Sequence, residues 1–222
     1  MGGVWGMSAW ELLRMGGPLM VPILLCSLFA LGIVIEKLSH FAMIQTGATQ
    51  FKANVFDLLK NNKIKESVQL CDTNPSPVAK ILKAGILKFG ASREEIKESI
   101  EDASLFEIPK LESRLGALGT IAHISPLLGL LGTVTGMMAC FHTIQVRAAS
   151  LNPVTPGDLA GGIEEALVTT VAGLMVAIPT FVAYNYFVSR INRFTLEMER
   201  AATELVNLMC HMAETGAFEQ TV

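Results

Sequence analysis

The chain has 222 residues, of which 51% are hydrophobic and only 17% are charged; its net charge is −3 and its mean hydropathy is +0.47. Soluble domains carry ~25% charged residues, so this composition excludes an ordinary soluble protein, and no basic cluster indicates a nucleic-acid partner. The four cysteines form no CxxC pair. We therefore expect neither a disulfide framework nor a metal or other cofactor, and interpret the cysteines as packing residues.

Three apolar stretches follow one another along the chain, at residues 17–35, 115–144 and 161–189. Because ~20 apolar residues cross a bilayer as a helix, each stretch predicts a transmembrane helix. The first is not followed by a small-x-small cleavage site, so we interpret it as an uncleaved anchor rather than a signal peptide. The sequence thus predicts an all-α membrane protein with three transmembrane helices.

The basic residues predict the topology, since segment 36–114 and the tail 190–222 hold most of the lysines and arginines. The positive-inside rule places both in the cytoplasm and the loop 145–160 in the periplasm. Residues 1–16 contain two tryptophans and predict an amphipathic helix that lies on the periplasmic face of the membrane. Within segment 36–114, Ser92 and Glu95 have the spacing of a capping box.

After the third apolar stretch, the helical pattern continues into the tail. A heptad spacing predicts that this stretch and the tail form one long helix, so that two of the three spans extend into a cytoplasmic helical bundle. The seam would pack against another helix, in the same chain or in a neighbouring copy. Its apolar positions are Phe187, Ile191, Phe194, Met198, Ala201, Leu205, Leu208 and Met212.

Small residues line one face of the second and third spans. Gly129, Gly132 and Gly136 share a stripe on the second span, and Gly173 lies on a similar face of the third. Matched small faces predict close helix contact in a tightly packed, multi-copy bundle. Helix packing explains the glycines completely. It explains the hydroxyl of Thr133 less well, because a hydroxyl in the membrane needs a hydrogen-bond partner. A carbonyl of its own helix can be that partner.

Glu165 indicates a functional site more strongly than the glycines or threonines do, because an apolar run begins directly after it. An intramembrane acid is costly and tends to mark an ion path, although an acid can also cap a helix N-terminus, the reading we favour for Glu164. At about 100° per residue, Thr169 shares the face of Glu165, so geometry alone selects Thr169 as its hydroxyl partner. Neither the second nor the third span carries another acid in its middle. We infer that a partner subunit supplies the missing carboxylate.

Two runs carry a family resemblance: SPLLGLLGTVTGMMACF from Ser125 and GGIEEALVTTVAGLMVAIPTFVAYNYF from Gly161. They resemble the MotA/TolQ/ExbB proton-channel family, and the three-span layout resembles its ExbB/TolQ branch. The resemblance implies a homopentameric ring in the bacterial inner membrane. The ring would enclose an ExbD/TolR-like single-span subunit with a membrane aspartate, and a TonB/TolA-like periplasm-spanning protein is a further implied partner.

By motif position, the family's pore threonines correspond to Thr133 and Thr170, and its membrane glutamate corresponds to Glu165. This choice of Thr170 conflicts with the geometric choice of Thr169, and we give the motif more weight. The resemblance predicts a proton-channel or stator subunit, not an enzyme, that uses the proton motive force for processes such as TonB-type import or Tol-Pal function. The alternatives are a structural membrane scaffold or a passive transport subunit.

Overall fold

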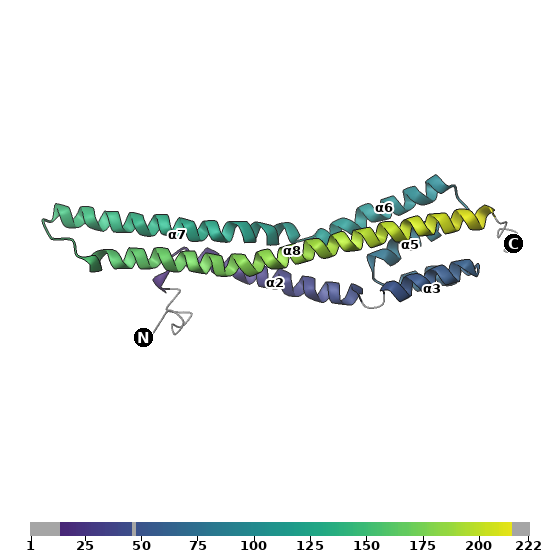
Figure 1. The fold of residues 1–222 in the computed structure, drawn as a ribbon, viewed down its shortest axis with the longest axis horizontal. Helices are drawn as coiled ribbons and strands as arrows, with labels where there is room; N and C mark the ends of the chain where they lie inside the picture. The colour runs from purple at the N-terminus through teal and green to yellow at the C-terminus, as the bar shows by residue number, and fades with distance from the viewer. Residues whose placement is uncertain (1–13, 46–47, 215–222) are drawn as a thin grey trace. The chain divides into compact units, whose positions relative to one another are not determined.

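The computed structural model describes residues 14–45 and 48–214, and within these ranges it contains helices and no strand (Figure 1). The helix expected near the N-terminus, over residues 1–16, lies largely outside the described residues. The described helices are α2 (Met20–Gln45), α3 (Ala48–Lys60), α4 (Ile64–Thr73), α5 (Pro77–Ile86), α6 (Arg93–Glu112), α7 (Leu115–Ala149) and α8 (Pro156–Glu214).

Three helical stretches are long and apolar enough to cross a membrane: Met20–Ala42, Arg93–Ala149 and Pro156–Ala213. They confirm an all-helical chain with three candidate transmembrane helices. Helix α8 runs unbroken from the third apolar stretch into the tail, which agrees with the heptad pattern seen in the sequence.

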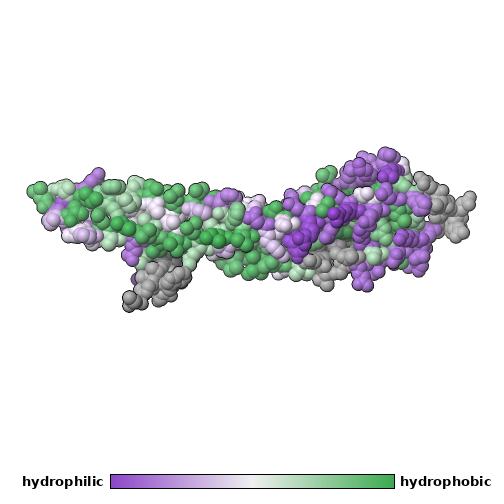
Figure 2. Space-filling model, in the orientation of Figure 1, coloured by the Kyte–Doolittle hydropathy of each residue, from purple (hydrophilic) through white to green (hydrophobic). Residues whose placement is uncertain are grey.

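The chain divides into two units. The apolar unit comprises Met1–Glu36 with Arg114–Tyr186, and the polar unit comprises Lys37–Ser113 with Phe187–Val222. Figure 2 shows hydrophobic side chains over α7 and the first part of α8, and hydrophilic side chains gathered over α6. The charges are thus concentrated in one unit, as they are in the sequence.

In the apolar unit, two ion pairs hold chain segments next to the apolar helices. Arg147 Nη2 near the end of α7 lies 2.5 Å from Asp158 Oδ1 in the first turn of α8. Asp158 also accepts a hydrogen bond from the backbone N–H of Thr155 at 2.9 Å. At the other end of the unit, Glu36 pairs with Arg114, which has a positive φ and directly precedes α7. These contacts fix both ends of the α7 segment.

The polar unit has a core built around α5 and α8. The predicted capping box at Ser92 and Glu95 is present at the start of α6. The heptad seam of α8 is largely buried. Phe41 of α2 stacks on Phe187 and Phe194, with ring centroids 5.8 and 5.7 Å apart. The sequence left open whether the heptad seam packs in its own chain or against a neighbouring copy. At Phe187 and Phe194 it packs in its own chain.

Three lysines pair with polar groups in the polar unit. The Glu107 carboxylate is buried and accepts hydrogen bonds from Lys80 at 2.8 Å and Lys110 at 2.6 Å. Lys37 is also buried and donates to the carbonyl of Leu111 at 2.8 Å. That carbonyl lies in the last turn of α6, where the helix dipole favours a cation.

Cys71 in α4 gives a chemical test of this core. Its side chain is buried, and burial, aided by the charge of Asp72, raises the pKa of its thiol to about 11. Because only the thiolate is nucleophilic, we expect its alkylation in the folded protein to rise about tenfold per pH unit up to that value. Iodoacetamide labelling followed by mass spectrometry measures this rate, with half-buried Cys210 as the reference. Labelling of Cys71 as fast as that of Cys210 at pH 8 would contradict the packing.

Candidate functional site

Helices α7 and α8 meet along a seam of small residues. On α7 the buried residues of this seam include Ser125, Gly129, Gly132, Gly136 and Cys140. On α8 the seam includes Ala166, Thr169 and Gly173, all buried. Positions four and three residues apart return to the same helix face, so each set forms one continuous stripe.

The two backbones come close enough that a single methyl group would collide. A Cβ on Gly173 would lie 2.6 Å from the carbonyl oxygen of Ser125, and one on Gly129 would lie 3.0 Å from the Cα of Thr170. Two turns further along α7, a Cβ on Gly136 would lie 2.9 Å from the Cβ of Ala166 and collide with the carbonyl oxygen of Gly162. The glycines are therefore required by the contact. The order of these pairs also shows that α7 and α8 run antiparallel.

Thr169 lies inside this seam, whereas Thr170 lies at its edge. Thr169 is fully buried against Gly132. Its hydroxyl stays within α8, 2.9 Å from the Glu165 carbonyl and 3.0 Å from the Ala166 carbonyl. The half-buried Thr170 reaches across, with its Oγ1 3.1 Å from the carbonyl of Gly129 and 2.9 Å from that of Ala166.

Thr133 and Thr170 lie on the same side of the seam. Each directly follows a seam residue, Gly132 on α7 and Thr169 on α8. Each is therefore rotated about 100° from that residue. Because the helices are antiparallel and face each other, the two rotations lead to the same side. Thr133 is half-buried, and its hydroxyl donates to the carbonyl of Leu130 at 2.6 Å.

Glu165 lies on the other side of the seam, because it precedes Ala166 instead of following a seam residue. Its half-buried side chain rests against the backbone of Gly17, just before α2; a Cβ on Gly17 would lie 2.7 Å from the Glu165 Cδ. Glu164 is exposed. Within one chain, the structure thus brings Thr133 and Thr170 to one side of the α7–α8 pair and places Glu165 on the side of α2.

The sequence interpretation missed the contact between Glu165 and Gly17. The available signal was a glycine pair at the mouth of the first span, together with an acid at the mouth of the third.

The hydroxyls of this unit bond mainly to the helices that carry them. Ser125 donates to the carbonyl of Ile121 at 2.8 Å, and Thr180 donates to that of Val176 at 2.6 Å. Across residues 14–45 and 48–214, no group of three or more His, Cys, Asp or Glu side chains is arranged to hold a metal ion. The chemistry these side chains offer is therefore hydrogen bonding to water or to an incoming polar group.

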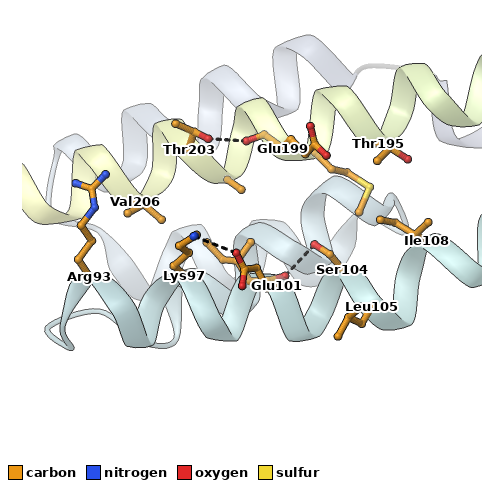
Figure 3. Close-up of a pocket in the computed structure, with 13 residues that line it drawn as sticks. Arg93, Lys97, Glu101, Ser104, Leu105, Ile108, Thr195, Glu199, Thr203 and Val206 are labelled. Carbon is orange, nitrogen blue, oxygen red and sulfur yellow. Dashed lines mark hydrogen bonds and ion pairs between the residues drawn. The ribbon is translucent and has the colours of Figure 1, made fainter.

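A second feature lies in the polar unit, where a groove of about 550 Å³ separates α6 from α8 (Figure 3). Its floor includes apolar side chains such as Ile100 and Met198. Lys97 and Glu101 form an ion pair of 3.3 Å on one wall. Leu105, on the same wall, has 72% of its surface exposed. An apolar groove bordered by charges is typical of an interaction surface.

These features define a class: a multi-pass helical membrane protein whose closely packed spans carry hydroxyls and a peripheral acid. The comparison with protein families is more specific. The chain belongs to the MotA/TolQ/ExbB proton channel family, whose model matches residues 73–200 and so covers all of α5, α6 and α7 and most of α8. This is a family of channel and transport proteins rather than a class of enzymes.

Curated relatives agree with this assignment. The biopolymer transport protein ExbB-like 3 of Synechocystis sp. is 34% identical over 198 residues, which cover 88% of this chain and 93% of that protein. The biopolymer transport protein ExbB of Salmonella typhimurium is 30% identical, covering 79% of this chain and 80% of the relative. The Tol-Pal system protein TolQ of Pseudomonas aeruginosa is 35% identical over 132 residues, covering 53% and 55%.

Replacement of glycine by alanine should have opposite effects on stability inside and outside the α7–α8 contact. Gly136→Ala should destabilise the protein by about 1–3 kcal/mol, because the added methyl group overpacks the contact with α8. Gly32→Ala in α2 meets nothing within 4 Å and should stabilise by up to ~1 kcal/mol through helix propensity. Denaturant unfolding in mixed micelles measures both changes. Equal effects of the two substitutions would show that α7 and α8 are not in backbone contact.

Proposed function

We propose that this protein is the proton-channel and stator subunit of a motor in the bacterial inner membrane. The observation that carries the proposal is the placement of Thr133 and Thr170 on one side of a sealed helix pair. No acid lies in the apolar middle of either helix: residues 115–146 and 166–189 contain no Asp, Glu, Lys or Arg. Hydroxyls without a titrating group can orient water or bond a carboxylate, but they cannot themselves alternate charge.

The missing carboxylate is supplied by a partner. An ExbD/TolR-like subunit with a single span and a membrane aspartate would present that group to the threonine-lined side of α7 and α8. Protonation removes the charge of the aspartate, which changes its interaction with the surrounding helices and drives relative movement. Moving one charge across the membrane supplies ~2.3 kcal/mol per 100 mV, so several protons are needed for appreciable work.

The subunits form a homo-oligomeric ring, and we take the pentamer of the family resemblance as the expected number. Support comes from the apolar side chains left exposed on α7 and α8, including Leu127, Met138 and Leu174. In the polar unit, the α6–α8 groove with exposed Leu105 offers a further surface for a second copy. Lipid covers the outside of such a ring and neighbouring subunits cover the rest.

In the proposed topology, the N-terminus lies in the periplasm and the polar unit lies in the cytoplasm. Glu165 then stands near the periplasmic end of α8, where protons enter. A TonB/TolA-like protein that spans the periplasm receives the work. The relative named as a Tol-Pal system protein supports Tol-Pal function as the process served, and the relative named as a biopolymer transport protein supports a transport process, for which the family resemblance implies TonB-type import.

A structural scaffold is the competing function, since the glycine seam alone would serve it. The two differ in their dependence on hydroxyls and on the acid. A scaffold should also assemble and act without any single-span partner. Co-expression with candidate partners that carry a membrane aspartate, followed by co-purification, separates the two functions.

Threonine variants test the ion path most sharply because Thr169 supplies a matched control. We expect Thr133→Val and Thr170→Val each to lower a proton-dependent activity about tenfold or more, equivalent to ~1.4 kcal/mol on the limiting barrier. Thr169→Val should have little effect, because the Thr169 hydroxyl is fully buried in the seam and bonds to its own helix, whereas Thr133 and Thr170 are only half-buried. Glu165→Gln should also reduce activity. Full activity of the Thr133→Val, Glu165→Gln double variant would favour the scaffold.

The groove tests the ring independently of proton transfer. Leu105→Glu should lower the fraction of assembled oligomer severalfold, because an unpaired charge is costly to bury at an interface. The matched control is Leu87→Glu, at a leucine that is 64% exposed and does not line the groove. Native mass spectrometry in detergent measures the oligomer. An unchanged oligomer with Leu105→Glu would remove this groove from the proposed interface.

A further inference from the structure

The turn before α2 makes a close contact with the proposed proton-pathway acid. Gly17 has a φ of +64° and lies at the mouth of the first span. The Glu165 side chain approaches its backbone so closely that a Cβ on Gly17 would lie 2.7 Å from the Glu165 Cδ and 3.4 Å from its Cγ, and would collide with Oε1. The carboxyl group therefore rests on main chain that carries no side chain.

Two independent features require glycine at this position. The positive φ is a conformation that only glycine adopts without cost, and the position of Glu165 leaves no room for a β-carbon. The N–H of Met20 donates to the carbonyl of Gly17 at 3.2 Å, which closes the turn as α2 begins. The turn is therefore held in place from both sides, by α2 and by the side chain of α8.

The neighbouring Gly16 extends the same contact along α8. Gly16 is buried, and a Cβ on it would lie 3.3 Å from Cγ1 of Val168. Val168 and Glu165 are three residues apart and so share one face of α8. The glycine turn thus covers a patch of α8 about one helical turn long, with the Glu165 carboxyl group at one edge.

We propose that Gly17 is a positioning residue for Glu165. By presenting bare backbone, it lets the carboxyl group lie against the start of α2, and it couples the position of that helix end to the position of the acid. Any larger residue displaces either the carboxyl group or the turn. The proposal rests on the proposed function for its meaning in proton transfer, because it assumes that Glu165 belongs to the ion path.

The test is the chemical accessibility of Glu165 in the assembled full-length protein. A water-soluble carbodiimide with glycine amide labels accessible carboxyl groups, and peptide mass spectrometry reports the labelling rate of each site. Exposed Glu164 is an internal reference in the same peptide region. Gly161→Ala is the matched control, since a Cβ there meets nothing within 4 Å and the residue lies one turn before Glu165.

With Gly17→Ala we expect labelling of Glu165 to rise severalfold, while labelling of Glu164 stays unchanged. Gly161→Ala should change neither acid. An unchanged labelling rate for Glu165 in Gly17→Ala would overturn the proposal. A parallel rise at Glu164 and Glu165 would also overturn it, because it would show general loosening of the helix end instead of local displacement.

Alanine at position 17 is unfavourable for two reasons: its Cβ collides with the Glu165 carboxyl group, and its backbone is strained at positive φ. A second variant separates these two effects. Glu165→Asp shortens the acid by one methylene and withdraws it from the turn. In that background, Gly17→Ala should lower the melting temperature in detergent less than it does with Glu165 present. An equal drop in both backgrounds would overturn the proposal, even if Gly17→Ala alone folds poorly.

Failure of the proposed function would look different. If Glu165→Gln leaves proton-dependent activity intact, Glu165 is not part of the ion path. The labelling and melting comparisons still decide whether Gly17 positions its side chain.

Discussion

The structure depends on the backbone contact between α7 and α8. In a lipid environment, apolar side chains gain little by packing on each other, so helices associate where small residues let their main chains approach. Gly129, Gly136 and Gly173 meet this condition, because a β-carbon on any of them would crowd or collide with the facing helix. This seal leaves no path between the two helices of one chain. The proposed ion path therefore runs along the one side of the pair on which Thr133 and Thr170 lie.

The same contact explains why the proposed activity requires a second protein. Burial in the seam makes the Thr169 hydroxyl bond to its own helix, and the hydroxyls of Ser125 and Thr180 also bond to their own helices. Such groups stabilise the helix pair but do not titrate. Glu165 is half-buried at the far side of α8, against the start of α2. A closely packed helix pair with threonine hydroxyls on one side can bind a carboxylate that a helix of another protein carries.

Much of the fold could be predicted from local sequence patterns. Hydropathy located the three candidate spans, the spacing of Ser92 and Glu95 predicted the capping box, and the heptad predicted a continuous α8. What neighbours each helix face could not be predicted, because rotation about a helix axis does not say which face another helix covers. Thr169 shares a face with Glu165 by rotation, yet only the structure shows Thr169 packed on Gly132. The glycine pair before α2 and Glu165 are each visible in the sequence, but they lie in distant segments, so no local pattern shows that they meet.

The most direct test is proton flux in liposomes that contain the purified protein and a trapped pH-sensitive dye. With an imposed membrane potential, the account predicts no flux through this protein alone. It predicts flux when a single-span partner with a membrane aspartate is included, and loss of that flux when the partner's aspartate is replaced by asparagine. Conduction by the protein alone, or conduction that is indifferent to that aspartate, would contradict the claim that the titrating group belongs to another chain.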